Sequence, residues 1–312
     1  MVAIAFVFPG QGSQSVGMQT DIAAAFPVVR ETYREAGDAL SLDLWRLVSD
    51  GPAADLDRTE ITQPAMLSAG VAAWRVANEL GDARPQCLAG HSLGEWTALT
   101  AAGALAFADA LRLVAERGRL MQDAVPAGTG AMAVIIGLDD DKVRAACAEA
   151  AEGDVVQAVN FNSPGQVVIA GATAAVERAC GVAKDNGARR AMTLPVSVPS
   201  HCDLMRPAAE RLAGQLDGVT IAEPELPVVN NVDVRAESAP EAIRAALLRQ
   251  LYSPVRWVET VEHLRDAHGV TALVECGPGR VLAGLTRRID KTLGAHALDS
   301  TEGFKGLGAV FS

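Results

Sequence analysis

The 312-residue chain has few aromatic residues and no excess of positive charge. Phe, Trp and Tyr make up 4% of it, while small apolar residues are abundant, which favours helices packed on sheets through small side chains. The formal net charge is -11, and a general nucleic-acid binder needs a basic face. We therefore exclude nucleic acid as a general partner, although a local cluster of Arg and Lys can still dock an acidic protein.

The chain also lacks paired cysteines and long apolar runs. Its five cysteines are widely spaced, and none forms a CxxC pair, so we expect neither a disulfide framework nor a zinc site. The opening MVAIAFVFPG has no basic leader, and its apolar stretch is too short to span a bilayer. These features predict a cytoplasmic protein with free thiols and no membrane association.

Short apolar runs that are typical of buried strands alternate with segments of helical spacing. The runs are 3–8, 86–91 and 270–276, and the helical segments are 21–40, 64–80, 93–105 and 281–289. Strands that alternate with helices indicate an α/β fold with a parallel sheet covered on both faces.

The middle of the chain has a different order. Strands are expected at 131–138, 155–161, 166–172 and 188–196, with helices after the first and third of them. This βαββαβ order is typical of a ferredoxin-like unit. We predict a small subdomain at 127–197, inserted into a large subdomain formed by 1–126 and 198–312.

The run GHSLG at 90–94 matches G-x-S-x-G and lies between a predicted strand and a predicted helix. In such a turn the serine is raised above the sheet edge, and the glycines avoid clashes. Ser92 is therefore a candidate nucleophile, with the N–H of Leu93 as an oxyanion donor. A helix-capping serine is the alternative, and the strand–turn–helix context disfavours it.

A second oxyanion donor is expected from the Gly-rich loop FPGQGSQ at 8–14, because that loop follows the first strand. Gln11 is the candidate. A dinucleotide-binding loop is the competing interpretation, and it fails because Ser15 stands where the third glycine is needed.

A serine nucleophile needs a base, and the chain has five histidines. His201, in the loop VPSH, is selected by elimination. His91 adjoins Ser92 and should diverge from it; the other histidines, His263, His268 and His296, lie in a charged helix or in a poorly patterned tail. No acidic partner is evident, because Asp203 is too close in sequence, so a backbone carbonyl can orient the imidazole.

Eight motifs in order now carry a family resemblance. They are FPGQGSQ, TQPA (62–65), GHSLGE, RGRLMQ (117–122), NFNSPGQVVIAG (160–171), VPSH, SPVRW (253–257) and GPG (277–279). Together they resemble the malonyl-CoA:acyl carrier protein transacylases of bacterial fatty acid synthesis, from about residue 4 to residue 290. The resemblance implies an α/β hydrolase-like core with a ferredoxin-like insert.

The resemblance also implies roles for individual residues. Ser92 and His201 would form the catalytic pair, with the backbones of Gln11 and Leu93 as oxyanion donors. The backbone carbonyl of Gln250 would orient the histidine. Three weaker assignments place Asn160 and Asn162 near a pantetheine channel and Gln63 behind the substrate site.

Arg117 carries the expected acyl selectivity. On sequence alone a surface arginine on a helix is the favoured interpretation, whereas the resemblance implies a guanidinium that binds the free carboxylate of malonate. Two parallel hydrogen bonds suit that pairing. Met121, one helical turn further, would line the same pocket.

The implied reaction is a ping-pong transfer from malonyl-CoA to an acyl carrier protein, with coenzyme A thioester as substrate and no metal or redox cofactor. Carrier proteins of this type are acidic, so a basic docking patch is expected, with Arg189, Arg190, Arg287, Arg288 and Lys291 as candidates. The alternatives are a stand-alone acyltransferase of polyketide synthesis, a plain serine hydrolase and a non-catalytic interaction protein.

Overall fold

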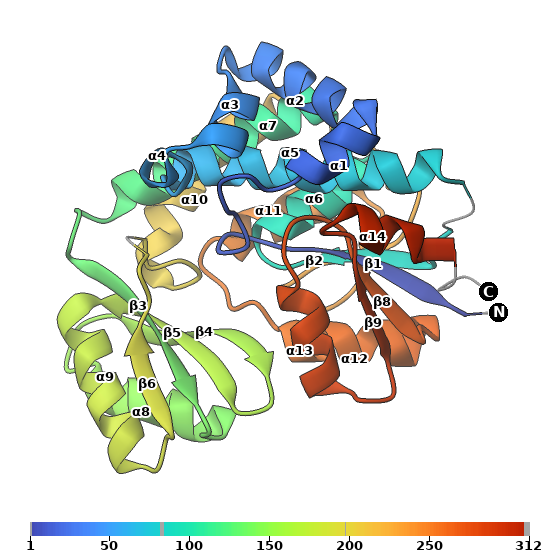
Figure 1. Ribbon diagram of the computed structural model, residues 1–312. Helices are drawn as coiled ribbons and strands as arrows, with labels where there is room; N and C mark the ends of the chain where they lie inside the picture. Colours follow the sequence, from blue (N-terminus) through green and yellow to red (C-terminus); the bar gives the residue numbers. More distant parts are fainter. Residues whose placement is uncertain (1, 82–83, 197, 309–312) are drawn as a thin grey trace.

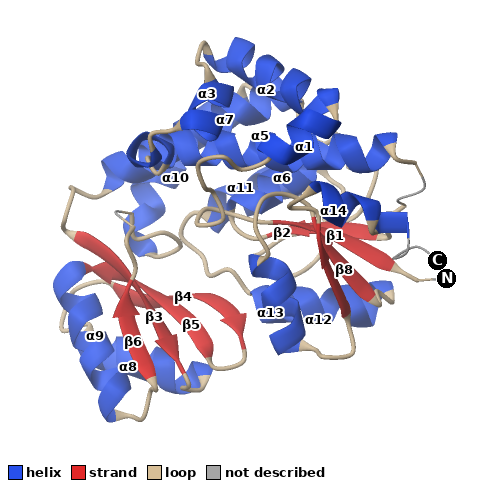
Figure 2. Ribbon diagram, in the orientation of Figure 1, coloured by secondary structure: helices blue, strands red, loops and turns tan. Residues whose placement is uncertain are grey.

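The computed structural model describes residues 2–81, 84–196 and 198–308. Figure 1 shows a larger part built around one sheet, with a smaller part beside it that has its own sheet. Figure 2 shows helices on both sides of the larger sheet and helices against one side of the smaller sheet.

The larger sheet is parallel, with strand order β7-β2-β1-β8-β9. Its strands are β1 (Ile4–Phe8), β2 (Cys87–Gly90), β7 (Val228–Val229), β8 (Ala272–Glu275) and β9 (Gly294–Ala297). Central β1 is buried on both faces, which explains its unbroken apolar sequence. Ile4, Phe6 and Phe8 pack on one side, while Ala5 and Val7 pack on the other.

Helices cover both faces of this sheet. α5 and α6 lie over one face, and α12 and α13 lie over the other (Figure 1). The helices of the larger part are α1 (Thr20–Ala25), α2 (Pro27–Leu40), α3 (Leu44–Asp50), α4 (Ala53–Leu56), α5 (Thr59–Glu79), α6 (Leu93–Ala101), α7 (Phe107–Ala124), the short 3₁₀ turn η1 (Asp203–Met205), α10 (Arg206–Asp217), α11 (Pro240–Gln250), α12 (Trp257–His268), α13 (Val281–Ile289) and α14 (Thr301–Lys305).

The smaller sheet is antiparallel, with strand order β4-β5-β3-β6. Its elements follow the chain as β3 (Gly130–Ile136), α8 (Asp140–Ala150), β4 (Val156–Ser163), β5 (Gln166–Ala172), α9 (Thr173–Asp185) and β6 (Arg190–Thr193). The first strand and the third lie at the centre, which is the ferredoxin-like arrangement. The predicted fold class, an α/β core with a small ferredoxin-like unit, is confirmed.

Backbone hydrogen bonds join the two parts along β4. Phe161 N donates to Val255 O at 3.0 Å, and Val255 N donates to Val159 O at 2.8 Å. Further along, Arg288 of α13 donates to the side-chain oxygen of Gln166 at the start of β5 (2.7 Å). The small sheet is therefore held against the carboxyl ends of the large one.

The structure refines two sequence observations on the larger part. The segment 21–40 is two helices and not one, because Phe26 is extended (φ -129°, ψ 104°) and Pro27 starts α2. The helical backbone conformation is disfavoured for a residue that precedes a proline. The supposedly unpatterned tail around His296 contains β9, whose edge position requires little apolar sequence.

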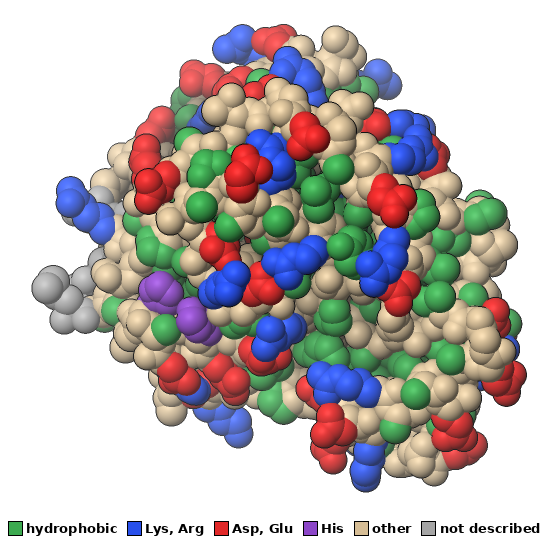
Figure 3. Space-filling view, turned by 180° about the vertical axis from the view of Figure 1, so that it is seen from behind, with side chains coloured by type: hydrophobic (Ala, Val, Ile, Leu, Met, Phe, Trp, Pro, Cys, Tyr) green, Lys and Arg blue, Asp and Glu red, His purple; other side chains and the backbone are tan. Residues whose placement is uncertain are grey.

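Within the described ranges, no helix is both long and apolar enough to cross a membrane. The same residues contain no group of three His, Cys, Asp or Glu side chains arranged to hold a metal ion. On the face shown in Figure 3, acidic and basic side chains are interspersed.

Candidate active site

The turn between β2 and α6 carries Ser92 in a strained backbone conformation, with φ 52° and ψ -108°. The flanking glycines are needed for this turn. A Cβ at Gly90 would lie 1.9 Å from the backbone of Gly94, and a Cβ at Gly94 would lie 1.9 Å from Phe8 O. The helix begins at Leu93, so the N–H of Leu93 lies next to the serine at the positive end of the helix dipole.

His201 lies beside Ser92, with 2.7 Å between His201 Nε2 and Ser92 Oγ. The histidine is 3% exposed and also has a positive φ of 66°. Its backbone N–H donates to Leu251 O at 3.0 Å, which fixes the loop against the end of α11. The structure thus brings together the two residues predicted as nucleophile and base.

The other imidazole nitrogen contacts a backbone carbonyl. His201 Nδ1 lies 2.8 Å from Gln250 O, so Nδ1 is the donor and Nε2 is free to accept the serine proton. Asp203 is engaged elsewhere, because its carboxylate pairs with Arg206 at 2.7 Å and accepts from Gln157 at 2.8 Å.

The electrostatic environment keeps His201 neutral. Burial and, to a smaller extent, the positive charge of Arg117 together lower the pKa of His201 to about 3, while the hydrogen bond to the carbonyl of Gln250 opposes them. A neutral imidazole is the form that accepts a proton.

Arg117, on α7, is only 1% exposed. Its guanidinium donates to Gln63 Oε1 at 2.8 Å, to Gln250 Oε1 at 3.2 Å and to Ser92 Oγ at 3.5 Å. Burial lowers the pKa of Arg117 to about 10, so it stays protonated at neutral pH. Its Nε is buried without a hydrogen-bond partner, so the guanidinium keeps donor capacity for a ligand.

A cavity of about 120 Å³ joins these side chains. Its lining residues are Gln11, His91, Ser92, Leu93, Arg117, Met121, Met132, Asn160, Leu194, Val196, Val198, Ser200 and His201. Both parts contribute apolar side chains, and Asn160 adds a polar group from the smaller part. The cavity therefore combines a few polar groups around the serine with a largely apolar lining.

The weaker sequence assignments are distributed around this cavity. Asn160 lines it, and its Oδ1 is buried without a partner. Among the residues that the structure describes, neither Gln63 nor Asn162 lines the cavity. Gln63 contacts Arg117 and donates to Met121 Sδ (3.6 Å), while Asn162 Oδ1 lies 2.8 Å from His91 Nε2.

Two buried polar residues escaped the sequence analysis. Asn231 Oδ1 accepts the N–H of Ser92 at 2.7 Å, and its amide donates to Gly90 O at 2.7 Å. Glu95, in the first turn of α6, accepts from the N–H of Asn231 at 2.9 Å and from Gln250 Nε2 at 2.7 Å. Glu95 ends the motif GHSLGE, so its position after the elbow was the available signal.

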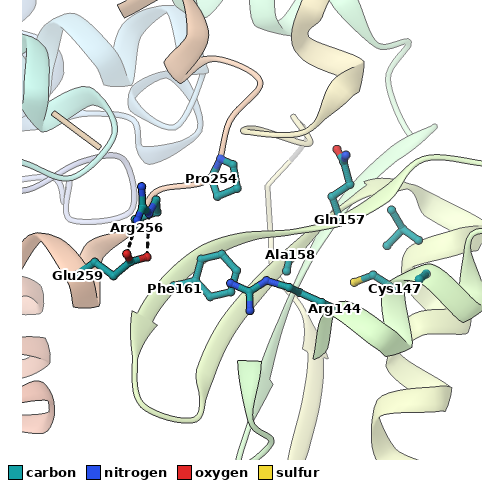
Figure 4. A pocket seen from close by; sticks show the side chains of 10 residues that line it. Arg144, Cys147, Gln157, Ala158, Phe161, Pro254, Arg256 and Glu259 are labelled. Atoms are coloured by element: carbon teal, nitrogen blue, oxygen red, sulfur yellow. Dashed lines mark hydrogen bonds and ion pairs between the residues drawn. The ribbon is translucent and has the colours of Figure 1, made fainter. Parts of the chain in front are cut away.

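A second cleft, of about 380 Å³, lies between α8, β4 and the segment before α12 (Figure 4). Its arginines already have partners: Arg256 pairs with Glu259, and Arg144 pairs with Asp141 and lies over the ring of Phe161. Burial raises the pKa of its Cys147 to about 12, so this thiol is not a nucleophile at neutral pH.

Known proteins share this arrangement. Residues 5–297 match the acyl transferase domain family. The malonyl CoA-acyl carrier protein transacylase of Escherichia coli (strain K12) is 59% identical over 299 residues, which cover 96% of each chain. The protein of that name from Haemophilus influenzae (strain Rd) is 56% identical over 308 residues, 98% of each. The chain belongs to the malonyl CoA-acyl carrier protein transacylase family.

Solved structures of the transacylase family superimpose closely. An acyl carrier protein S-malonyltransferase from Vibrio cholerae gives a TM-score of 0.95 at 57% identity, covering 97% of this chain and 99% of that one. A malonyl-transacylase in complex with its type II polyketide synthase acyl carrier protein gives a TM-score of 0.96 at 57% identity, covering 97% of this chain and 98% of that one. The predicted membership and the acyltransferase class are confirmed.

Proposed function

We propose that this chain transfers the malonyl group of malonyl-CoA to the phosphopantetheine thiol of an acyl carrier protein, through an ester on Ser92. The observation that carries the proposal is that Ser92 Oγ is contacted from one side by a neutral imidazole and from the other by a buried guanidinium. The first contact supplies nucleophilic chemistry, and the second selects an acyl group with a free carboxylate.

In the first half-reaction His201 Nε2 takes the proton of Ser92 as Oγ attacks the thioester carbon. The negative charge that develops on the carbonyl oxygen is stabilised by the backbone N–H groups of Gln11 and Leu93, both of which line the cavity. The carbon–sulfur bond then breaks, coenzyme A leaves with the proton from His201, and Ser92 carries the malonyl ester.

Arg117 determines which acyl group is accepted. Its guanidinium is charged, buried and has a donor without a partner. A malonyl carboxylate satisfies that donor, whereas an acetyl methyl group leaves it unpaired. An unpaired buried donor costs more free energy when it belongs to a charged group than when it belongs to a neutral one. We therefore expect kcat/KM to favour malonyl-CoA over acetyl-CoA by about 10²-fold. Met121 forms part of the same wall.

In the second half-reaction the carrier's thiol gives its proton to His201 and attacks the ester on Ser92. Both substrates present the same pantetheine arm, so one channel serves both steps. The unpartnered Oδ1 of Asn160 is an acceptor suited to an amide N–H of that arm. Acyl exchange between a thiol and a hydroxyl involves no change of oxidation state, so we propose that no metal or redox cofactor participates.

The insert assigned to residues 127–197 shields the ester from water in this scheme. Leu194 and Val196 come from the end of this segment, and they line the same cavity as the serine. A dry cavity protects a serine ester from hydrolysis, which is the reaction that a plain hydrolase would favour. We place the enzyme in the cytoplasm, where the carrier and coenzyme A thioesters are available.

The candidate docking arginines form one row across the two parts. Arg190 pairs with Ile136 in the small sheet, Ile136 pairs with Gln166, and Gln166 accepts from Arg288. Arg189 lies against Gly137 beside this row, while Arg287 donates to Ala295 O. We propose that this row, with Lys291, meets the acidic carrier.

A carrier of polyketide synthesis is the second candidate partner. One structural relative was solved with a type II polyketide synthase acyl carrier protein. The chemistry at Ser92 is the same in both cases, and only the protein that removes the malonyl group differs.

The deciding experiment is intact-mass measurement after mixing the protein with malonyl-CoA or acetyl-CoA. We expect a malonyl adduct that is absent in Ser92→Ala and that exceeds acetyl loading. Addition of purified fatty acid or polyketide holo-carriers then shows which one removes the adduct. Preferential acetyl loading, or a malonyl adduct that persists in Ser92→Ala, would contradict the proposal.

A further inference from the structure

Gln250 was expected to act only through its backbone carbonyl, yet its side chain contacts three other parts of the site. The residue is fully buried at the end of α11. Its carbonyl accepts from His201 (2.8 Å), and its side-chain Oε1 accepts from Arg117 (3.2 Å). Its Nε2 donates to Ser92 O at 3.1 Å and to Glu95 Oε2 at 2.7 Å. One residue therefore links base, acyl selector and nucleophile.

The orientation of this amide depends on Glu95. The two ends of an amide have similar shapes and opposite hydrogen-bonding roles, and a carboxylate can only accept. Glu95 therefore holds the NH₂ end of Gln250 toward itself, which turns the oxygen toward Arg117. In the reverse orientation the NH₂ group would face a guanidinium and the oxygen would face a carboxylate, and both contacts would be repulsive.

Glu95 also supports the serine through Asn231. The backbone N–H of Asn231 donates to Glu95 Oε2 at 2.9 Å, and the side chain of Asn231 holds the N–H of Ser92 and the carbonyl of Gly90. The strained φ of Ser92 is thus maintained by a residue whose own position depends on Glu95.

Charge explains why a carboxylate occupies this buried position. Glu95 and Arg117 are each 1% exposed, and the neutral oxygens of Gln63 and Gln250 do not balance the guanidinium charge. Burial raises the pKa of Glu95 to about 7, and the charge of Arg117 opposes that rise. A buried cation without an opposing charge is costly, so ionised Glu95 offsets the charge of Arg117 until a malonyl carboxylate takes over that role.

We propose that Glu95 is a positioning residue that acts through the side-chain amide of Gln250 to hold Arg117 and His201 in one arrangement around Ser92. The proposal rests on the proposed malonyl transfer. It adds a residue that touches no substrate and whose loss impairs loading through its neighbours.

The first test is rescue by a conservative variant. Glu95→Gln keeps one oxygen to accept from Gln250 and Asn231, whereas Glu95→Ala removes both contacts. We expect the kcat/KM of malonyl loading to fall about 10- to 100-fold in Glu95→Ala, as for a lost hydrogen bond to a charged group, and to stay within about threefold of wild type in Glu95→Gln. Equal loading by wild type and Glu95→Ala would overturn the role of Glu95.

The second test asks whether the effect passes through Gln250. Gln250→Ala keeps the backbone carbonyl that accepts from His201 and removes only the amide. If Glu95 acts through that amide, the double variant Glu95→Ala/Gln250→Ala loads malonyl about as fast as Glu95→Ala alone. Fold-losses that multiply in the double variant would overturn the proposal. Should Glu95→Ala not fold, Glu95→Leu replaces it in both tests, with circular dichroism and thermal unfolding as the check.

Glu275 provides the matched control. It too is a fully buried glutamate whose pKa burial raises to about 7, but its carboxylate accepts from Ala283 N at 2.8 Å in α13, away from the serine. We expect Glu275→Gln and Glu275→Ala to load malonyl at the wild-type rate. A loss in Glu275→Ala equal to that in Glu95→Ala would show a general effect of removing a buried carboxylate and overturn the specific role. Wild-type protein that takes up no malonyl group would instead overturn the proposed function itself.

Discussion

His201 Nε2 lies 2.7 Å from Ser92 Oγ, although 109 positions separate the two residues in the chain. The contact is made by two strained turns, each with a positive φ at a residue other than glycine. The imidazole is held at its far nitrogen by a carbonyl and not by a carboxylate, so no nearby negative charge raises its pKa. A base of this kind is neutral over the whole physiological range.

The first prediction concerns the pH dependence of this base. Burial and Arg117 lower the pKa of His201 to about 3, so its proton-accepting form persists at acidic pH. Acylation of Ser92 by acetyl-CoA, which carries no free carboxylate, is expected to keep a constant rate from about pH 5 to pH 8, whereas an ordinary histidine would lose half its activity near 6.5. Rapid-quench mass spectrometry measures this rate, and a fall with a midpoint near 6.5 would contradict the prediction.

The second prediction concerns acyl selection. Arg117→Met removes the charge and the paired donors while filling a similar volume. We expect kcat/KM for malonyl-CoA to fall about 10²- to 10³-fold while acetyl loading is retained, because only the malonyl carboxylate uses the guanidinium. Arg117→Lys keeps the charge without the planar guanidinium, so its kcat/KM for malonyl-CoA should lie between those of wild type and Arg117→Met. An unchanged ratio of malonyl to acetyl loading would exclude Arg117 as the selector.

Local sequence patterns were sufficient for the elbow and the insert. The elbow is signalled by the glycines on either side of Ser92, which lie within a few residues of each other. The insert is signalled by the βαββαβ order, in which each element can be recognised from its own segment. The network beneath the serine was not predictable in this way. Gln250 is 155 positions from Glu95, and Asn231 follows β7, a strand of only two residues, so neither partner has a periodic signal. Their meeting depends on the packing of whole elements.

The third prediction tests the close approach at the elbow. Gly94→Ala would place a Cβ 1.9 Å from Phe8 O, and both atoms belong to packed backbone. We expect a loss of unfolding free energy of more than about 4 kcal/mol or failure to fold. Gly284→Ala, within α13 and with no atom within 4 Å of the added Cβ, should instead gain about 0.5–1 kcal/mol. Urea unfolding monitored by circular dichroism measures both, and similar changes in the two variants would contradict the steric argument.

The fourth prediction concerns the carrier. Reversing the charge at Arg190 and Arg288 changes two cations that Ile136 and Gln166 place in one row. We expect KM for the holo-carrier to rise about tenfold at low ionic strength, and less at high salt, while loading of Ser92 from malonyl-CoA keeps its rate. Arg34→Glu, on the exposed face of α2, is the matched control. An unchanged carrier KM would remove the row from the docking surface.

The last prediction follows from the electrostatic effect of one guanidinium, that of Arg117, on two carboxylates, those of Glu95 and of the malonyl group. In the unloaded enzyme burial, with a small contribution from Asp233, raises the pKa of Glu95 to about 7, while hydrogen bonds from Asn231 and Gln250 and the charge of Arg117 oppose that rise. Glu237 lines the small cavity on the other side of Glu95. When a malonyl carboxylate pairs with Arg117, the restraint on Glu95 weakens and its pKa rises, so loading takes up a proton. Because loading takes up a proton, the affinity for malonyl-CoA must rise as the pH falls.

Malonyl-CoA is expected to bind more tightly as the pH falls from about 8 to about 6, because protonated Glu95 no longer places a second negative charge near the malonyl carboxylate. In Glu95→Gln this dependence should be absent, since no titrating group remains at that position. KM for malonyl-CoA at each pH, with acetyl-CoA as the reference that carries no competing carboxylate, gives the comparison. Parallel pH profiles for wild type and Glu95→Gln would show that the proton is taken up elsewhere.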